Sequence, residues 1–155
     1  TGGLFFGIGT NSNTSSQGVY KFENNTFSTL MTGSSVQSIC IGAGGNVYYA
    51  NSGTIYDMQN NVVFTHPGSY STCLSYDASI NTFFVVAQDK IYDDQGNLLY
   101  QTPYQTGSMQ DMTINTTTQK IMISLQAMAA TMDYDGSNYT PLYVNKQSMY
   151  TLSFK

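Results

Sequence analysis

The stretch Ser35-Val36-Gln37-Ser38-Ile39-Cys40-Ile41 decides the fold, because its pattern recurs three more times along the chain. The pattern is serine, apolar, any residue, small or polar, apolar, any residue, apolar. Successive copies begin 34, 39 and 40 residues apart, and a period of this size is typical of solenoids and propellers. The second copy departs from the pattern at its last position, Ser75. The further copies are 69–75, 108–114 and 148–154.

Each of the first three copies is followed by the same succession of elements. A polar or glycine-rich break precedes a strongly β-prone run, and a third strand then ends in an Asn- or Gly-containing turn before a fourth strand. The unit therefore predicts four antiparallel strands in 34 to 40 residues. The breaks are 42–45, 77–79 and 116–118; the β-prone runs are 47–50, 82–87 and 120–125; the turns are 60–61, 96–97 and 136–137; the fourth strands are 62–64, 98–100 and 141–144.

The two ends of the chain complete one unit between them. The fourth copy supplies a first strand only, 149–154, whereas the N-terminal part supplies the missing strands at 4–8, 19–22 and 27–31. A closed ring explains this split, because pairing of the first and last strands in one sheet removes an open edge. We therefore expect the C-terminal strand 149–154 to pair with the N-terminal strands within 4–31.

This arrangement resembles the β-propeller superfamily, in its repeat architecture rather than in a sequence signature. The Gly-His and Trp-Asp pairs of WD40 blades, a kelch pattern and a hemopexin motif are not found. The resemblance implies a single all-β domain, 1–155, folded as a four-bladed propeller with four-stranded antiparallel blades; a β-sandwich or jelly roll is the alternative. The expected blades are 35–68, 69–107, 108–147, and 148–155 together with 1–34.

Charge is unusually sparse in this chain. Charged residues make up 9%, against about 25% in an average soluble protein, and all five cations are lysine. Amides and hydroxyls must therefore keep the surface soluble, and unlike carboxylates they do not titrate near pH 4. This composition indicates a surface exposed outside the cell, in acid, and the alternative is a low-charge bacterial or viral structural protein at neutral pH.

The same composition argues against two classes of partner. A net charge of −4 without a basic cluster makes a nucleic-acid phosphate backbone an unfavourable partner. No apolar run approaches the roughly 20 residues that a membrane-spanning helix needs. The chain begins at Thr1, so we expect it to be processed or to belong to a larger protein or assembly.

In propellers, the loops from fourth to first strand and from second to third strand share one face around the channel mouth, and ligands usually bind there. Mapped onto this chain, that face carries hydrogen-bonding and aromatic groups suited to sugars or polar peptide surfaces. The alternative is that these are ordinary polar surface loops. The candidate ligand-binding residues are Asn11, Asn13, Asn51, His66, Gln88, Tyr104 and Gln126.

Catalytic chemistry has little support in the sequence. His66 is the only histidine, which limits general-base and metal-ligand chemistry, and we expect this loop residue to be exposed. A glycan-cleaving enzyme needs paired carboxylates, and only Asp89 and Asp111 are expected near the channel mouth. We therefore predict no catalytic residues, no metal and no cofactor.

Three aspartates recur at the ends of third strands, namely Asp57, Asp93 and Asp133. A position that recurs in a repeat is typical of a structural turn-former rather than a site. The stretch 133–138 superficially resembles a calcium loop but lacks the downstream glutamate of an EF-hand. Its alignment with the other hairpin turns is the better explanation.

Cys40 and Cys73 fall on the first strands of adjacent blades. In the repeat alignment, Cys73 matches Ile39 and Cys40 matches Leu74, which places the two cysteines on opposite faces of their sheets. A disulfide is then permitted in one of the two orientations, if the Cα atoms lie within about 7 Å. Buried free thiols are the alternative.

Four Asn-x-Ser/Thr sequons permit N-glycosylation. A chain so rich in Asn, Ser and Thr contains several by chance, so they do not argue for a glycoprotein. They begin at Asn13, Asn24, Asn115 and Asn138.

The function hypothesis is a non-catalytic extracellular adhesion or binding module, such as the receptor-binding head of a virion spike or cell-surface appendage. Its ligand would be a cell-surface glycan or protein receptor. A structural decoration subunit of a particle or filament is the first alternative, and a carbohydrate-active enzyme is the second. Fold alone does not choose among them, because propellers support many unrelated functions.

Overall fold

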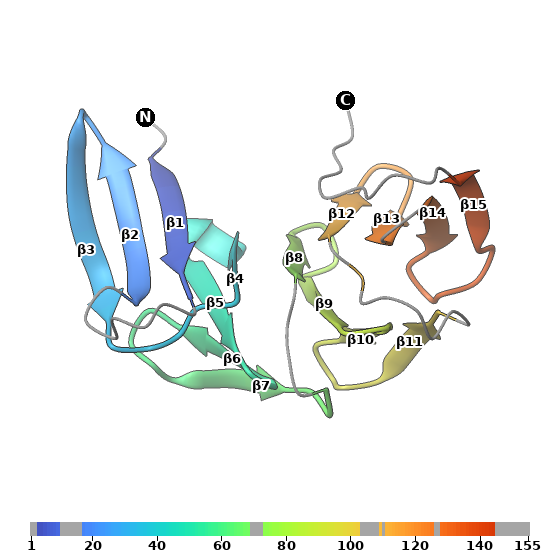
Figure 1. Cartoon of the computed structure of the whole chain (residues 1–155), viewed down its shortest axis with the longest axis horizontal. Coiled ribbons are helices and arrows are strands. Elements are labelled where there is room, and N and C mark those ends of the chain that lie inside the picture. The colour runs from blue at the N-terminus through green and yellow to red at the C-terminus, as the bar shows by residue number, and fades with distance from the viewer. Residues whose placement is uncertain are drawn as a thin grey trace.

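In the part of the chain that the computed structural model describes, fifteen strands form four antiparallel sheets (Figure 1). The structure describes residues 3–9, 17–68, 73–102, 109, 111–125 and 128–144. Within these residues no helix is long and apolar enough to cross a membrane. The strands are β1 (Leu4–Ile8), β2 (Gly18–Glu23), β3 (Thr26–Thr32), β4 (Ser38–Ile41), β5 (Val47–Asn51), β6 (Thr54–Asp57), β7 (Val62–Thr65), β8 (Cys73–Asp77), β9 (Thr82–Ala87), β10 (Lys90–Asp93), β11 (Leu98–Gln101), β12 (Asp111–Asn115), β13 (Lys120–Leu125), β14 (Met128–Asp133) and β15 (Thr140–Val144).

The sheets are arranged as blades around a common axis. Strands β4–β7, β8–β11 and β12–β15 each form a four-stranded meander, and β1–β3 form a three-stranded one. Strand β8 lies between β4 and β12, and β1 lies beside β4, so these strands are nearest the axis (Figure 1). The all-β propeller architecture is confirmed. The predicted closing strand 149–154 lies outside the described residues, so closure of the ring stays a prediction.

The predicted hairpin turns form because an aspartate organises each one. The Asp57 carboxylate accepts hydrogen bonds from the backbone N–H groups of Gln59 and Asn61, each at 2.9 Å. Asp93 repeats this geometry with Gln95 and Asn97 at 2.9 and 2.8 Å. Left-handed residues occupy the tips at Asn60, Gly96 and Gly136, as tight hairpins require.

Asp133 serves the same purpose at the tip of the β14–β15 hairpin. Its carboxylate accepts hydrogen bonds from Asn138 Nδ2 at 2.6 Å and from Lys120 Nζ. Asp135 Oδ1 in turn accepts the Ser137 N–H at 2.8 Å. The expected turn-forming role of Asp57, Asp93 and Asp133 is thus confirmed, and 133–138 is the tip of a hairpin.

A β-bulge recurs at one place in every blade and fixes the true register of the repeat. The bulge opens in the outermost strand opposite Val19/Tyr20, Ile55/Tyr56, Ile91/Tyr92 and Ala129/Ala130. In each blade, the second residue of this pair and the residues that pair with it on the inner strands form a row across the sheet. The four rows are structurally equivalent. The rows are Phe6–Tyr20, Ile39–Tyr49–Tyr56, Leu74–Val85–Tyr92 and Met112–Ile123–Ala130.

This row corrects the alignment of the second repeat by one residue. Leu74, not Cys73, is equivalent to Ile39, so Cys73 is equivalent to Ser38 and Asp111. With this alignment the second repeat has no mismatch, because Tyr76 rather than Ser75 is equivalent to Ile41 and Ile114 at the last apolar position.

The core is divided among the junctions between blades. One cluster joins β1–β3 to β4–β7 through Val19, Met31 and Tyr49, and another joins β4–β7 to β8–β11 through Ile55 and Val85. The largest joins β8–β11 to β12–β15 and includes Met109, Met112 and Met132. Hydrophobic burial therefore holds each blade to its neighbours.

A buried polar contact supports the junction between β8–β11 and β12–β15. The Asp77 side chain is fully buried at the end of β8. It accepts hydrogen bonds from Ser79 N and Ser79 Oγ at 2.8 and 2.7 Å and from Tyr134 Oη at 2.7 Å. Because Tyr134 follows β14, this carboxylate ties one blade to the next.

The face of β1–β3 that points away from β4 is apolar and open among the described residues. Phe6 is 43% exposed, whereas its row equivalents Tyr49, Val85 and Ile123 are 2%, 0% and 0% exposed. Leu4 on the same face is 61% exposed. In three blades the residue at this position is thus completely buried. In the fourth, β1–β3, the equivalent residue Phe6 is also a large apolar residue but is exposed.

Candidate functional site

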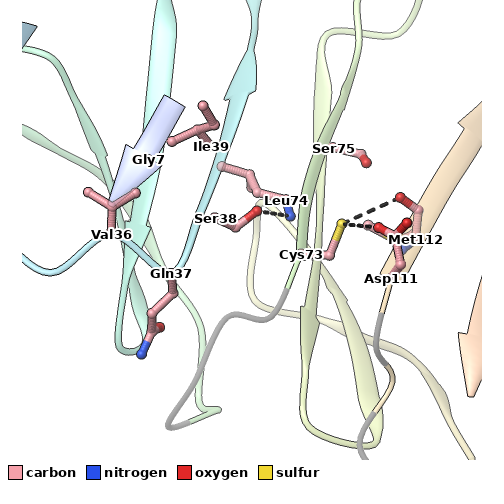
Figure 2. Close-up of a pocket in the computed structure, with 10 residues that line it drawn as sticks. All are labelled: Gly7, Val36, Gln37, Ser38, Ile39, Cys73, Leu74, Ser75, Asp111 and Met112. Carbon is pink, nitrogen blue, oxygen red and sulfur yellow. Dashed lines mark hydrogen bonds between the residues drawn. The ribbon is translucent and has the colours of Figure 1, made fainter. Parts of the chain in front are cut away.

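A pocket of about 380 Å³ opens where the innermost strands begin (Figure 2). Strands β4, β8 and β12 start at this end, so it is the face that the loops from fourth to first strand reach. Pockets of a few hundred Å³ suit small ligands. The lining residues are Gly7, Val36, Gln37, Ser38, Ile39, Cys73, Leu74, Ser75, Asp111 and Met112.

The first residues of the three innermost strands form a polar row around this pocket. Ser38, Cys73 and Asp111 are structurally equivalent, and Ser38 and Cys73 each contact the following blade. Ser38 Oγ accepts the Leu74 N–H at 2.9 Å. Cys73 Sγ donates to Asp111 Oδ1 at 3.5 Å and to the Met112 carbonyl at 3.4 Å (Figure 2). The row therefore links neighbouring blades and also places a carboxylate in the pocket wall.

The Cys73 thiol is held in its protonated form. The pKa of Cys73 is raised to about 12, with burial as the largest cause and the negative charge of Asp111 as the second. Burial likewise raises the pKa of Cys40 to about 12, with Cys73 as the smaller cause. Because the thiolate is the reactive species, neither cysteine is activated as a nucleophile or metal ligand at neutral pH.

Both cysteines are free thiols, and the predicted placement on opposite faces is wrong. In the corrected register, Cys40 and Cys73 occupy faces that each point to the following blade. Cys40 packs in the junction between β4–β7 and β8–β11, whereas Cys73 packs in the next junction. The sheet β8–β11 thus directs the Cys73 side chain away from Cys40, and no bridge forms.

The hydrogen bonds between loops confirm that the two sets of loops share this face. His66 N donates to the Gly53 carbonyl at 2.9 Å, and Thr102 N donates to the Asp89 carbonyl at 2.9 Å. Each bond joins a connection after a fourth strand to the turn between the second and third strands of the same blade. Both sets of loops therefore lie on one face, as the sequence predicted, and ligand binding on this face stays a prediction.

Of the predicted ligand-binding residues, the three that the structure describes, Asn51, His66 and Gln88, are not among the residues that line the pocket. Asn51 ends β5 and is half-buried, and Gln88 is an exposed left-handed residue whose carbonyl accepts the Met109 N–H at 2.7 Å. Asn11, Asn13, Tyr104 and Gln126 lie outside the described residues. Sequence reasoning missed Ser38, Cys73 and Ser75 as lining residues, and the one-residue error in the second repeat concealed the equivalence of Cys73 with Ser38 and Asp111.

His66 is buried, so the expectation that it is exposed is wrong. It is 6% exposed and its ring stacks on Tyr92 of the following blade, with ring centroids 5.5 Å apart. Its Nδ1 accepts the Gly68 N–H at 3.1 Å. Burial lowers the pKa of His66, so the neutral ring is a structural part of this junction.

We predict a pH-dependent stability that originates at His66. An unfolded histidine titrates at about pH 6.5, and the native pKa is lower, so the unfolded chain binds the proton more readily. Stability should therefore be full above about pH 6.5 and decrease as the pH falls toward the native pKa. Urea unfolding at about pH 7.5 and about pH 5.5 measures this change.

The matched variant is His66→Asn, which retains an acceptor for Gly68 N–H and does not titrate. Its unfolding free energy should depend less on pH over this interval than that of the natural chain. An equal dependence in the two proteins would exclude His66 as the cause.

Three of the four sequons lie within the described residues. Asn24 is an exposed left-handed residue of the β2–β3 turn. Asn115 Oδ1 accepts the backbone N–H groups of Thr117 and Thr118, and Asn138 Nδ2 donates to Asp133. Asn13 lies outside the described residues. Of the three, Asn24 presents its amide most openly, since no hydrogen bond to this side chain is among those described.

The two carboxylates considered for catalysis are in different surroundings. Asp111 lines the pocket, whereas Asp89 does not and accepts a hydrogen bond from Gln101 Nε2 at 2.9 Å. Among the described residues, no group of three or more His, Cys, Asp or Glu side chains is placed to hold a metal ion. The described pocket wall therefore offers hydrogen-bonding chemistry and one carboxylate.

Comparison with known proteins identifies the fold. No protein-family model matches the sequence, and no curated protein does. Among solved structures, 118 chains are similar. One, in the crystal structure of a nidogen/laminin complex, is a β-propeller that matches with a TM-score of 0.68 and 12% identity, over 85% of this chain. This chain spans 60% of that neighbour's length.

Proposed function

We propose that this domain is a non-catalytic recognition module that binds its ligand on the face of the molecule where the pocket opens. The observation that carries the proposal is the pocket of about 380 Å³ at the start of the innermost strands. Hydroxyl, amide and carboxylate groups from three blades converge there with apolar side chains. This combination orients a small ligand group, or one protruding group of a larger ligand.

The chemistry of the pocket favours binding over catalysis. Both thiols are protonated at neutral pH because burial raises the pKa of each. Glycoside cleavage requires two carboxylates that flank the scissile bond, and the described lining supplies Asp111 alone. The nidogen/laminin structure is of a complex, and by analogy of fold alone it agrees with a protein or glycan receptor as the ligand.

The composition supports a site of action outside the cell. A chain with 9% charged residues depends on surface amides and hydroxyls, which hold their hydration in acid where carboxylates protonate. We infer that the domain is exposed on a virion or cell surface as part of a larger protein or assembly. A receptor-binding head of a spike or appendage is the specific form of this proposal.

A structural decoration subunit is the second candidate, and the outermost strands favour it. Strands β3, β7, β11 and β15 contain no charged residue, although charges commonly protect the edge strands of sheets from association. Apolar side chains at the rim are exposed. They are Phe27, Leu30, Val62, Val63, Leu98 and Leu142. Lateral packing in a shell or filament would cover them.

A glycan-array screen and a surface-protein array, each at about pH 4 and about pH 7, test the recognition proposal. We expect strong binding to one ligand class, lost in a Gln37→Trp variant that places an indole at the pocket mouth. Gln59→Trp, at the exposed tip of the β6–β7 hairpin, is the matched control and should bind normally.

The outcome separates the two candidates. Binding that Gln37→Trp removes and Gln59→Trp retains would support recognition through the pocket. An absence of binding at both pH values, with both variants folded, would contradict the recognition proposal and favour the decoration subunit.

A further inference from the structure

We propose that the edge strand β3 pairs antiparallel with β3 of a second copy of this chain, about a twofold axis through Ser28. The contact lies on the outermost strand of its blade (Figure 1), and no residue of β3 lines the pocket, so it does not depend on the recognition function. Three features carry it, namely an unprotected edge, a self-complementary backbone and an exposed aromatic ring beside the axis.

Strand β3 is the longest of the four outermost strands. It has seven residues, six of them exposed, whereas β7 and β11 have four residues each and β15 has five, one of them Pro141. Short length, proline and charged side chains commonly protect an edge strand from pairing with another chain. The sequence of β3, 26–32, contains neither proline nor a charged residue. Strand β3 therefore lacks the features that block addition of another strand.

The register of the β2–β3 hairpin shows which backbone groups of β3 point outward. Glu23 pairs with Thr26 across the two-residue turn 24–25, and the residues that flank such a turn are hydrogen-bonded to each other. Hydrogen-bonded and non-hydrogen-bonded pairs alternate along an antiparallel ladder. Phe27 and Thr29 therefore direct their N–H and C=O groups away from β2, toward the free edge.

A twofold axis through Ser28 matches these outward groups with each other. Phe27 then lies opposite Thr29 of the second copy, and Thr29 lies opposite Phe27 of the second copy. Each of these pairs exchanges two N–H···O=C hydrogen bonds. The two three-stranded sheets become one continuous antiparallel sheet of ordinary size, joined by the same surface on both copies.

The exposed ring of Phe27 gains a partner in this arrangement. Phe27 is 68% exposed, and its ring centroid lies 4.7 Å from that of Phe22 and 6.2 Å from that of Phe6. In the paired strands, the two Phe27 side chains occupy diagonal positions on the same face of the sheet, within reach of each other. The aromatic cluster of one copy thus continues into the next, and burial of these rings adds to the backbone hydrogen bonds.

The charges of the neighbouring strand do not oppose the contact. Lys21 Nζ lies 2.7 Å from Glu23 Oε2 on β2, so these two side chains together bring no net charge to the edge. Like charges directly opposite each other destabilise a sheet, and the paired residues 26–30 include no charged side chain. A second copy of β3 therefore meets no repulsion along the paired residues.

Sedimentation of the full chain over a range of concentrations measures the association. Five residues from each copy form a small contact, so we expect a reversible dimer that becomes populated at about 0.1–1 mM. Phe27→Lys puts two like charges beside the axis and should raise the Kd of the dimer by about tenfold. Val62→Lys, on the exposed edge strand β7, is the matched control and should dimerise as the natural chain does.

Disulfide trapping tests the register of the pairing, in a chain that also carries Cys40→Ser and Cys73→Ser. Ser28→Cys places two thiols directly opposite each other at a non-hydrogen-bonded position, where Cα atoms are about 4.5 Å apart and a disulfide fits. Mild oxidation should therefore link two copies. Thr32→Cys, exposed on the same strand, is the control, because its two thiols would lie on the order of 25 Å apart.

Two outcomes would overturn the inference. One is a chain that stays monomeric up to about 1 mM, or that links as readily through Thr32→Cys as through Ser28→Cys. The other is a dimer that Val62→Lys weakens and Phe27→Lys does not, which would place the contact on another edge. Both experiments are done without ligand, so their failure leaves the recognition proposal unaffected.

Discussion

Replacing Asp77 with alanine is expected to lower the free energy of unfolding by about 3 kcal/mol. The substitution removes a fully buried carboxylate that accepts three hydrogen bonds. It leaves the Tyr134 hydroxyl and both donors of Ser79 without their acceptor in a buried region, and each unsatisfied buried group costs about 1–3 kcal/mol. Because Tyr134 belongs to the following blade, the loss weakens the junction between two blades.

Urea unfolding of Asp77→Ala, Tyr134→Phe and the double variant measures this contribution. The sum of the two single losses in unfolding free energy should exceed the loss in the double variant, since both changes break the same contact. Asp135→Ala is the control, because Asp135 is exposed at a hairpin tip and its loss should cost less than about 1 kcal/mol. Additive effects of Asp77→Ala and Tyr134→Phe would show that the contact does not join the blades energetically.

The contribution of this contact to the free energy of unfolding depends on pH, because Asp77 ionises. Burial alone would raise the pKa of Asp77, but hydrogen bonds from Ser79 and Tyr134 outweigh burial and lower it. The native state therefore binds this proton less readily than the unfolded chain, where aspartate titrates at about pH 3.9. The contribution is present above that pH and is lost as the pH falls through the native pKa.

The second large effect is expected at Phe6, where an aspartate should cost about 3 kcal/mol or more. Phe6 is equivalent to three completely buried residues, Tyr49, Val85 and Ile123. If the ring closes, strand 149–154 and the blade β12–β15 cover Phe6, and an aspartate there would be buried without a partner. If the face is open to water, the substitution should cost about 0.5 kcal/mol.

Val62→Asp is the matched control for this prediction. Val62 lies on the outermost strand β7 and is more exposed than Phe6, and no blade is expected to cover it. Thermal unfolding of the two variants should show a large decrease for Phe6→Asp and a small one for Val62→Asp. Similar small decreases would show that nothing covers the β1–β3 face.

The fold was accessible from sequence because repetition supplies several independent observations of one pattern. Alternation of apolar residues predicted strands within one or two residues in most cases, and Asn and Gly marked the turns at 60–61, 96–97 and 136–137. The error in the second repeat has a physical cause. Cys73 and Leu74 are both apolar, so alternation does not decide which of them faces the preceding blade. Only the hydrogen-bond register does.

The candidate site was less accessible, because its geometry depends on contacts between blades. The equivalence of Ser38, Cys73 and Asp111 is visible only in the correct register. The burial of His66 arises from Tyr92 in the following blade, and a loop histidine beside a proline carries no sign of such a partner. Local sequence predicted which face carries the loops, but not which side chains meet at the axis.

The repeat register predicts which residues pair if the C-terminal strand closes a four-bladed ring. Leu152 takes the pattern position of Ile39 and Met112, whose partners are Tyr49 and Ile123, so its predicted partner is Phe6. Residues 145–148 would connect the end of β15 to this strand, a connection close in length to 33–37 between β3 and β4.

Disulfide trapping between Phe6→Cys and Leu152→Cys, with Cys40→Ser and Cys73→Ser in the same chain, tests the closure most directly. Directly opposite residues of antiparallel strands have Cα atoms about 4.5–5.5 Å apart, within the range of a disulfide. Phe6→Cys with Thr151→Cys is the control, because residue 151 should face the opposite side. We predict an intramolecular bridge in the first protein and free thiols in the control, by mass spectrometry. Free thiols in both proteins, or a bridge only between two copies, would contradict the closed ring.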